Sequence, residues 1–295
     1  MIHYLSFCVH QRVLRVFIFP QITQILADKE KEDLQKIMKG FGFERLQCKI
    51  IVYLPQNFRM QVKRILLKFS GESLAGQDSY GLDYQAVNHF AEEIKSVVDR
   101  GVEVGVVIGG GNIFRGVKGA GKGFDRRQGD YMGMLATIIN GMAMQNALEA
   151  MDVKVKLFSS LEIEGVVEKI FFKKVVEHLQ KGYVVILAGG TGNPFFTTDS
   201  GAALRAVEIK ADALIKGTRV DGVYTADPEK DPTATKYDEL TFTEAYERNL
   251  NIMDMTAFTL CKENNMTVYV YNANVKGNLL KMLSGEKIGT RIINK

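Results

Sequence analysis

Two segments of this chain are nearly continuous apolar runs, where a half-exposed strand would alternate apolar and polar residues. They are VEVGVVI (102–108) and YVVILA (183–188). A strand of this kind is buried on both faces, which is typical of a parallel sheet covered by helices on each side. The sequence therefore predicts an α/β fold, a three-layer αβα sandwich with a central, mostly parallel sheet.

Strand and helix patterns alternate from residue 60 to the C-terminus. The helix expected at 83–100 carries apolar residues such as Val87 and Ile94 at helical spacing, and Gly101 follows it as a stop. We predict strands at 62–69, 102–108, 153–158, 183–188, 212–216, 267–271 and about 289–293, and helices at 83–100, 130–150, 171–181, 199–210, 255–264 and 276–284. Asp221-Gly222 predicts a tight hairpin turn after strand 212–216.

Charge separates the N-terminal segment from the rest of the chain. The net charge is +4, and residues 1–59 hold nine Lys/Arg against five Asp/Glu, so residues 60–295 are balanced and are not a basic nucleic-acid binder by composition. The segment 4–19 is too short and too charged to span a bilayer and does not resemble a signal peptide. We expect a single domain at 60–295, with Met60 as the natural start and 1–59 as an extension without catalytic role. The alternative is an accessory segment for docking or regulation.

Four glycine- and polar-rich loops each lie next to a predicted strand. They are KFSGESL (68–74), VIGGGNIFRG (107–116), AGGTGNPFFTTDS (188–200) and KGTRVDGVYTADP (216–228). Glycine lets backbone N–H groups approach an anion closely, and ligand sites in such sheets lie at the carboxyl ends of the strands. Four such loops indicate two phosphate-bearing ligands, as expected of an enzyme that passes a phosphoryl group between nucleotides.

The first two loops offer charge as well as backbone donors. Lys68 could neutralise a moving phosphoryl group, and Arg115 could contact a phosphate through two nitrogens. The alternatives are a lysine in solvent at a strand end and an arginine in a surface ion pair. Three consecutive glycines at 109–111 indicate close approach to an anion or, alternatively, a structural turn. Neither of these two loops is a Walker A motif, because GxxxxGK[ST] is absent from the chain.

The other two loops combine aromatic, hydroxyl and acidic residues. Asp130 and Asp199 each begin a predicted helix, so each could be an N-cap. Asp130 could instead accept hydrogen bonds from a ribose, and Asp199 could orient Lys68 or a metal-bound phosphate. Tyr224 could face an adenine ring, and Asp227 could bind its ribose or amino group, or simply form a turn with Pro228. A Met-rich face of helix 130–150 is expected in the core or at a subunit contact.

The residue types that are missing narrow the chemistry. His89 and His178 have no nucleophile or carboxylate beside them in sequence, and we expect both to be packing or surface residues. The cysteines Cys8, Cys48 and Cys261 lack metal or redox spacing, which favours reduced thiols and a cytoplasmic protein. A phosphoryl transfer to a phosphate acceptor needs no general base, since the nucleophile is already an anion. The absence of a catalytic histidine therefore fits that reaction.

The chain closely resembles bacterial UMP kinases of the amino acid kinase superfamily from about Lys63 to the C-terminus. The residues that carry the resemblance are KFSGESL, VGVVIGGGNIFRG, GDYMGMLATIINGMAMQNALE, GTGNPFFTTDS, VDGVYTADPEKDPTA and MDMTAFTLC. The resemblance implies the amino acid kinase fold. It also implies transfer of the ATP γ-phosphate to UMP, giving UDP and ADP, in pyrimidine nucleotide biosynthesis, with Mg²⁺ on the ATP phosphates.

The resemblance also implies a role for individual residues. The catalytic residues would be Lys68, Arg115 and Asp199. ATP would be bound by Lys68, Phe69, Ser70, Gly71, Gly111, Arg115, Thr218, Tyr224 and Asp227. UMP would be bound by Gly110, Asp130, Thr191, Gly192, Asn193, Pro194, Phe195, Phe196, Thr197 and Thr198. No protein ligand to a metal is assigned.

Family members form homohexamers, and many are activated by GTP and inhibited by UTP. The activator segment would correspond to Gly76, Gln77, Asp78, Ser79, Tyr80 and Gly81. Residues 1–59 have no counterpart in the family, and 161–174 is less typical of it. Gly217 stands where alanine is common, and we expect it to loosen its loop.

Two other functions stay open at this point. One is a relative that phosphorylates an amino-acid carboxylate, which would need a basic residue in place of Asp130 and the TGNPFFTT stretch. The other is a nucleotide-binding sensor, storage protein or co-regulator without turnover, against which Lys68, Arg115 and Asp199 argue. No membrane partner is expected, and no nucleic acid is required.

Overall fold

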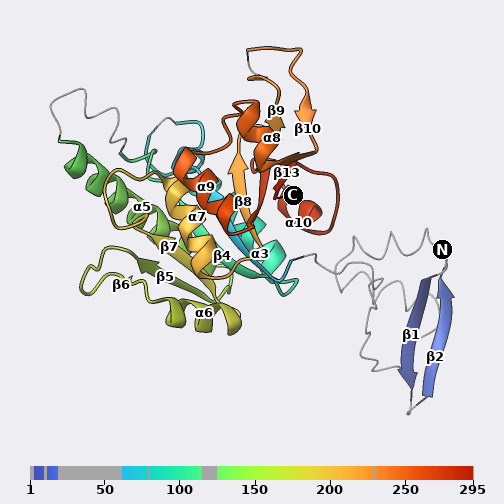
Figure 1. The fold of residues 1–295 in the computed structure, drawn as a ribbon. Coiled ribbons are helices and arrows are strands. Elements are labelled where there is room, and N and C mark those ends of the chain that lie inside the picture. The colour runs from blue at the N-terminus through green and yellow to red at the C-terminus, as the bar shows by residue number, and fades with distance from the viewer. Residues whose placement is uncertain are drawn as a thin grey trace. The chain divides into compact units, whose positions relative to one another are not determined.

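The structure is a computed structural model that describes residues 3–9, 12–18, 62–78, 80–114, 125–228 and 230–294. The chain divides into two compact units, Met1–Arg59 and Met60–Lys295. In the first unit, β1 (His3–Val9) and β2 (Arg12–Ile18) pair as an antiparallel hairpin (Figure 1). Within the described ranges, no helix is long and apolar enough to cross a membrane.

The second unit is built on one nine-stranded sheet. Its strands are β3 (Arg64–Phe69), β4 (Glu103–Ile108), β5 (Val155–Ser159), β6 (Glu168–Lys169), β7 (Val184–Ala188), β8 (Ala213–Thr218), β11 (Glu239–Thr241), β12 (Thr267–Asn272) and β13 (Thr290–Ile293). Their order is β11-β13-β12-β8-β3-β4-β7-β5-β6. Neighbouring strands are parallel except β12 and β13. The predicted mostly parallel sheet is confirmed.

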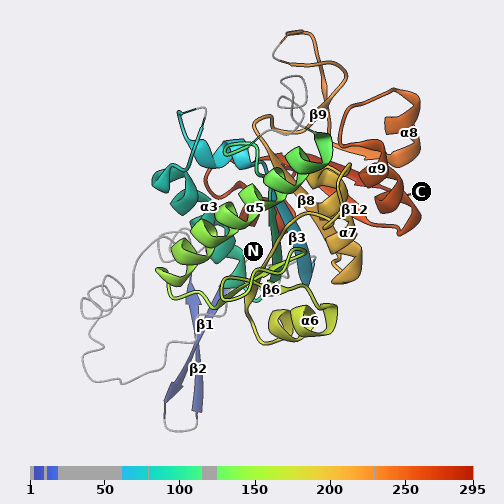
Figure 2. The ribbon, with the colours of Figure 1, turned by 90° about the vertical axis from the view of Figure 1, so that its left-hand side faces the viewer.

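Helices cover both faces of this sheet. They are the short 3-10 helix η1 (Gly71–Ala75) and the α-helices α3 (Tyr84–Val98), α5 (Arg126–Glu149), α6 (Phe172–Gln180), α7 (Thr198–Glu208), α8 (Phe242–Glu247), α9 (Met255–Glu263) and α10 (Asn278–Leu283). One core cluster joins Ile65, Leu67 and Phe69 of β3 to α3, α5 and α10, and Figure 2 shows α3 and α5 side by side. The other joins Leu66 to α6, α7, α8 and α9. The predicted three-layer sandwich is confirmed.

The alternation of side chains along a strand decides where two lysines point. Leu66 of β3 and Leu214 of β8 both pack on the α7 side of the sheet. Because side chains two residues apart share a face, Lys68 and Lys216 point to that side as well. The two strands are parallel neighbours with Lys68 directly opposite Lys216. Two cations therefore meet at the carboxyl end of the sheet, next to the start of α7.

The predicted hairpin at Asp221-Gly222 is wrong. The strand after this turn, β9 (Val223–Tyr224), pairs with β10 (Lys236–Tyr237) in a separate two-stranded sheet that projects from the unit in Figure 1. Both long edges of β8 are already taken by β3 and β12. The chain instead passes over Thr290, whose Oγ1 accepts a hydrogen bond from the Val223 N–H at 2.8 Å. Gly222 permits this crossing, because a Cβ there would lie 2.6 Å from Thr290 Oγ1.

Two helices begin earlier than their sequence pattern indicated. Asp125 caps α5 by accepting hydrogen bonds from the backbone N–H groups of Arg127 and Gln128, so Asp130 lies in the second turn and is not the cap. Thr197 caps α7 through its side chain, so Asp199 is not the cap there. Both aspartates thus keep their carboxylates for other contacts.

The methionines of α5 do not form one face. Met134 and Met144 are buried, whereas Met132 and Met142 are exposed. Residues two apart on a helix with 3.6 residues per turn lie on opposite sides, so the four could not share a stripe. Met134 and Met144 therefore pack in the core, which is one of the two expected alternatives, and a subunit contact of Met132 and Met142 stays a prediction.

Candidate active site

A carboxylate held between two lysines lies at the carboxyl end of the sheet. Asp199 Oδ1 is 2.9 Å from Lys68 Nζ, and Asp199 Oδ2 is 2.7 Å from Lys216 Nζ. Lys216 Nζ also donates to the carbonyl oxygen of Ile252 at 2.6 Å. The three charged side chains are only 12–19% exposed. The cluster carries one net positive charge, which suits it to hold a phosphate.

Burial and charge act in opposite directions on this cluster. Burial of Asp199 raises the pKa of its carboxyl, but the charges of Lys68 and Lys216 outweigh that effect and leave the pKa below its ordinary value. Burial lowers the pKa of Lys216, and the charge of Asp199 offsets only part of that shift. Asp199 is therefore ionised throughout the neutral range and fixes the positions of both ammonium groups.

The sequence analysis did not single out Lys216 or Asp254. Asp254 accepts hydrogen bonds from the Ser200 hydroxyl at 2.9 Å and from the Ala257 N–H at 3.0 Å, and it is also bonded to the Thr197 hydroxyl. It therefore ties the start of α7 to the start of α9. A signal was available for Lys216, because it ends a predicted strand just as Lys68 does. Asp254 directly precedes the predicted helix 255–264 and is its N-cap, which is a local signal, but its contacts with Ser200 and Thr197 join residues more than 50 positions apart and no local pattern marks them.

The first three glycine-rich loops are in direct contact. A Cβ on Gly71 would lie 2.3 Å from the carbonyl oxygen of Gly109, and one on Gly109 would lie 3.5 Å from Thr198 Oγ1. A Cβ on Gly110 would lie 2.7 Å from the carbonyl oxygen of Gly133 in α5. The glycines at these positions permit the loops to meet beside Lys68. Their backbone groups thus gather at the carboxyl end of β3, beside Lys68.

The close approach at Gly71 gives a testable contrast with Gly133. We expect Gly71→Ala to lower the unfolding free energy by about 1–3 kcal/mol, because the obstructing atom is backbone and cannot turn away. A shifted loop should also lower turnover about a hundredfold. At Gly133, which lies in a helix, an added Cβ would meet no atom within 4 Å. Gly133→Ala should therefore raise the unfolding free energy by about 0.5–1 kcal/mol. Urea unfolding of both variants measures this; equal stabilities would contradict the proposed packing at Gly71.

A buried pair of amides links the glycine triplet to the segment 76–81. Asn140 Nδ2 donates to the Gly109 carbonyl at 2.6 Å and to Asn112 Oδ1 at 2.7 Å. Asn112 Nδ2 donates in turn to the Gly81 carbonyl at 2.7 Å, and the Gly81 N–H donates to the Asn112 carbonyl at 2.8 Å. The expected activator segment is therefore tied to the glycine triplet. Tyr80 in this segment is exposed, and Ser79 lies outside the described residues.

The segment predicted to bind UMP lies against α5 and caps α7. The Phe195 N–H donates to Asp130 Oδ2 at 2.7 Å, which brings Asp130 to this loop. The loop residues are Thr191, Gly192, Asn193, Pro194, Phe195, Phe196, Thr197 and Thr198, and both phenylalanines are exposed. Phe195 has a φ of +74°, a left-handed conformation that costs a non-glycine residue about 1–3 kcal/mol.

The residues predicted to bind ATP are only partly brought together. Lys68 lies in the lysine–aspartate cluster, and Ser70 and Gly71 lie in the loop beside it. The Phe69 ring, in contrast, is buried against Phe90, with the ring centroids 4.5 Å apart. Only the Phe69 backbone reaches this edge, where its carbonyl accepts from the Gly109 N–H at 3.0 Å. Gly111 is the last residue of the glycine triplet, whose first residue Gly109 contacts Gly71, and Arg115 lies outside the described residues.

The remaining residues of the predicted ATP set come from the fourth loop. Thr218 Oγ1 donates to the Val220 carbonyl at 2.7 Å. Tyr224, in β9, bonds to Asp221, and Asp227 lies 3.3 Å from Lys230. The expectation that Gly217 loosens this loop is wrong. Gly217 lies in β8, where a Cβ would be 2.9 Å from the Phe69 ring, so glycine serves tight packing there.

His89, His178 and Cys261, which lie in the described part of residues 62–294, take no part in this site. A ring nitrogen of His89 bonds to the Ala273 carbonyl at 3.0 Å, and one of His178 bonds to the Lys174 carbonyl at 2.7 Å. Both therefore serve packing, as predicted. Cys261 is fully buried, and burial together with Asp199 and Asp254 raises the pKa of its thiol to about 12. Such a thiol is not a nucleophile at neutral pH.

Comparison with known proteins identifies the family. Residues 63–272 match the model of the amino acid kinase family. A uridylate kinase of Parabacteroides distasonis is 55% identical over 234 residues, which cover 79% of this chain and 99% of that protein. One of Porphyromonas gingivalis is 56% identical over 234 residues, covering 79% and 97%. This chain is a member of the amino acid kinase family, in its uridylate kinase branch.

Solved structures of the uridylate kinase branch share the fold. The UMP kinase of Bacillus anthracis superposes with a TM-score of 0.77 at 37% identity, covering 79% of this chain and 97% of that one. The UMP kinase of Ureaplasma parvum gives a TM-score of 0.75 at 38% identity, covering 80% and 100%. The span matched by the family model contains Lys68, Asp199 and Lys216.

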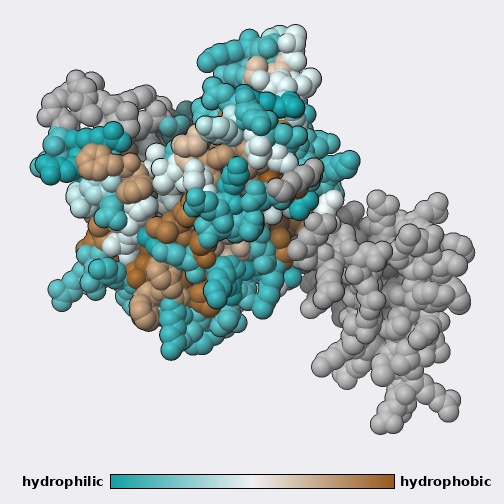
Figure 3. Space-filling model, viewed as in Figure 1, coloured by the Kyte–Doolittle hydropathy of each residue, from teal (hydrophilic) through white to brown (hydrophobic). Residues whose placement is uncertain are grey.

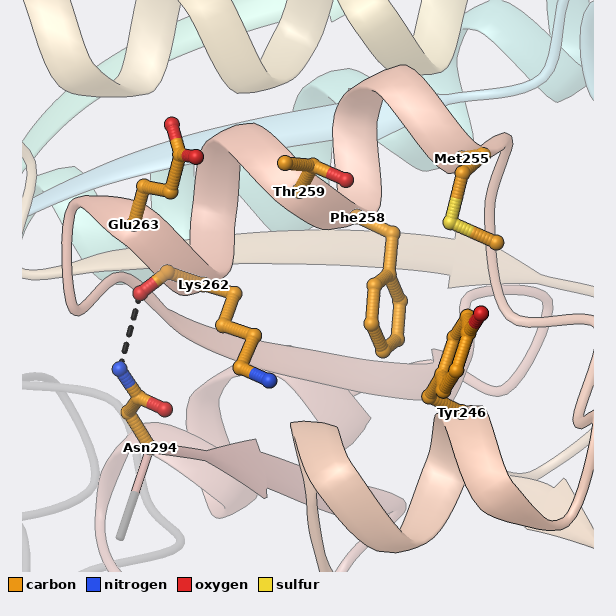
Figure 4. Close-up of a pocket in the computed structure, with 7 residues that line it drawn as sticks. All are labelled: Tyr246, Met255, Phe258, Thr259, Lys262, Glu263 and Asn294. Atoms are coloured by element: carbon orange, nitrogen blue, oxygen red, sulfur yellow. Dashed lines mark hydrogen bonds between the residues drawn. The ribbon is translucent and has the colours of Figure 1, made fainter.

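A cavity of about 530 Å³ lies elsewhere, between α8, α9 and the residues that follow β13. Figure 4 shows its lining side chains, which are Tyr246, Met255, Phe258, Thr259, Lys262, Glu263 and Asn294. None of the predicted ATP- or UMP-binding residues that the structure describes lines it. We place the candidate active site at the lysine–aspartate cluster, because charged side chains and the glycine-rich loops meet there.

Proposed function

We propose that this protein catalyses transfer of the γ-phosphoryl group of ATP to UMP, giving UDP and ADP. The observation that carries the proposal is the cluster of Lys68, Asp199 and Lys216 beside the glycine-rich loops, in a chain of the uridylate kinase branch. An oxygen of the UMP phosphate attacks the γ-phosphorus. The bond to the bridging oxygen of the ADP leaving group breaks, and no proton has to be removed from the nucleophile.

The cluster supplies positive charge where negative charge moves. Lys68 and Lys216 would stabilise the phosphoryl group during its transfer and the leaving β-phosphate. Asp199 would hold both lysines in place. Backbone N–H groups of the loop at 70–71 and of Gly110 would bind the phosphates, while the Gly109 N–H is bonded to the Phe69 carbonyl. Arg115 would add a further positive charge. Such catalysis consists of positioning and electrostatics, because the nucleophile is already an anion.

The two nucleotides would lie on different sides of the cluster. ATP would use Lys68, Ser70, Gly71, Gly111, Thr218, Tyr224 and Asp227, and it would bring Mg²⁺ as part of the substrate. UMP would lie against Gly110, Asp130 and the loop 191–198. Residues 60–295 would form the catalytic domain, and 1–59 would be an extension without catalytic role.

A homohexamer regulated by GTP and UTP belongs to the same proposal. Support for self-association comes from exposed apolar residues at helical spacing along α5, which are Tyr131, Leu135, Ile139 and Met142. In Figure 3, hydrophobic side chains also gather over the region where Figure 1 draws α6 and α7. The link from segment 76–81 to the glycine triplet through Asn112 supports an effector route into the site. A cytoplasmic location is proposed because both substrates are cytoplasmic metabolites.

The test is an ADP-release assay with MgATP and one acceptor at a time: UMP, CMP, dTMP or N-acetylglutamate. The full chain is compared with a chain that begins at Met60, and light scattering gives the mass of each. We expect fast turnover with UMP and at least a hundredfold less with the other acceptors. Both chains should be equally active.

Each alternative has its own outcome in this assay. Turnover with N-acetylglutamate instead of UMP would indicate a kinase that acts on a carboxylate. Nucleotide binding without turnover of any acceptor would indicate a sensor or storage protein. An inactive chain from Met60 would show that the N-terminal segment is integral to the enzyme.

A further inference from the structure

Phe195 has a backbone conformation that its position along the chain does not explain. Five described non-glycine residues have a positive φ: Asp152, Phe195, Lys210, Asn249 and Asn265. The other four lie within three residues of the end of a helix, where this conformation commonly terminates the helix. Phe195 lies in the middle of a loop. Something outside the loop must therefore hold it there.

Two residues one helical turn apart on α5 make the contacts that hold Phe195. Its N–H donates to Asp130 Oδ2 at 2.7 Å. Arg126 Nε lies 3.8 Å from the same oxygen, and the guanidinium carbon of Arg126 lies 5.4 Å from the centroid of the Phe195 ring. The Phe195 backbone thus contacts the Asp130 carboxylate, that carboxylate contacts the Arg126 guanidinium, and the guanidinium contacts the Phe195 ring. These three contacts form a closed cycle.

The Phe195 ring depends on Arg126 more than on the core. Phe195 as a residue is 57% exposed, so burial does little to fix its ring. Arginine can pair with a carboxylate and stack on an aromatic face at the same time, which lysine does less well. Arg126 thereby connects the strained backbone at Phe195 to the first turns of α5.

We propose that Arg126 is a positioning residue of the acceptor site. It holds the loop 191–197 in its binding shape through Phe195 and Asp130 before the acceptor arrives. This inference rests on the proposed function in so far as the loop binds UMP. When the loop is already ordered, UMP binding does not have to supply the free energy of ordering it. Arg126 should therefore affect the affinity for UMP more than the rate of the chemical step.

The kinetic test uses Arg126→Gln, with Arg127→Gln as the matched control. Arg127 is the neighbouring exposed arginine, and its Nε lies 3.4 Å from Asp125 instead. We expect Arg126→Gln to raise KM for UMP about two- to fivefold, the factor that a cation–aromatic contact contributes at an exposed site. KM for ATP and kcat should stay unchanged. Arg126→Lys should restore part of the loss, and Arg127→Gln should behave as the unaltered protein does.

A second readout needs no nucleotide. Hydrogen exchange of a peptide covering 191–198 should be about two- to fivefold faster in Arg126→Gln and unchanged in Arg127→Gln. Combining Arg126→Gln with Phe195→Leu should speed exchange by less than the sum of the two single effects, because both substitutions remove the contact between Arg126 and the Phe195 ring and only the Arg126–Asp130 contact remains to be lost. Unchanged exchange in Arg126→Gln would overturn the positioning role. If the unaltered protein does not use UMP, the proposed function fails. Faster exchange in Arg126→Gln would still show that Arg126 positions the loop.

Discussion

Lys68→Ala should lower turnover with UMP about a thousandfold while the protein stays folded. The side chain lies at the carboxyl end of β3, and its ammonium group is 2.9 Å from Asp199. Removing it takes away a positive charge from the place where the phosphoryl group moves. Because Lys68 is only 12% exposed, the charge acts in surroundings that water screens poorly. Steady-state ADP release measures the loss.

The control for Lys68 is Lys63→Ala. Lys63 lies just before the same strand, but its side chain is 80% exposed and it is 3.8 Å from Glu103. Its replacement should leave turnover within about twofold, as expected for an exposed ion pair. Melting curves of both variants check that the fold is kept. If Lys68→Ala retained more than a tenth of the activity, Lys68 would have no part in the transfer.

Asp199→Asn should cost both activity and stability. Without the carboxylate, Lys68 and Lys216 face each other as two largely buried cations. Leaving buried charges without their partner typically lowers the unfolding free energy by about 3 kcal/mol. Both lysines also lose the group that fixes them, so turnover should fall about a thousandfold. Urea unfolding and ADP release measure the two effects.

Asp152→Asn is the matched control for this change. Asp152 is exposed and has a positive φ of 59°, a conformation that asparagine adopts as readily as aspartate. Stability and turnover should both be unaltered. An Asp199→Asn protein as stable as the control would mean that the two lysines are not held by Asp199.

The pKa of Asp199 also sets a pH dependence. The pKa of the Asp199 carboxyl in the folded protein is below its ordinary value of 3.8, so the stabilisation that this carboxylate provides is fully present above pH 3.8 and is lost as the pH falls through the folded pKa. The unaltered protein should therefore lose stability relative to Asp199→Asn only below about pH 4. Urea unfolding at pH 3 to 7 measures the difference, which should narrow as the pH falls. A constant difference across that range would exclude ionised Asp199 as its source.

Local pattern was enough to predict most of the fold. The continuous apolar strands 102–108 and 183–188 correspond to β4 and β7, which lie next to each other and are parallel. The first residues of the helices were harder to predict from the sequence. The cap of α5 is Asp125, five residues before Asp130, because a polar first turn gives no apolar period to detect. The turn at Asp221-Gly222 has the composition of a hairpin, but both edges of β8 were already occupied.

The sequence by itself determined the α/β layering and marked Lys68, Asp199 and the glycine-rich loops, because strand periodicity, helix periodicity and glycine runs are properties of neighbouring residues. Only the tertiary structure decided that Lys216 shares Asp199 with Lys68, and that Arg126 reaches Phe195. These contacts join residues 17 to 131 positions apart in the chain. They depend on which strands become neighbours and on how each helix is rotated about its axis, and no local pattern contains that information.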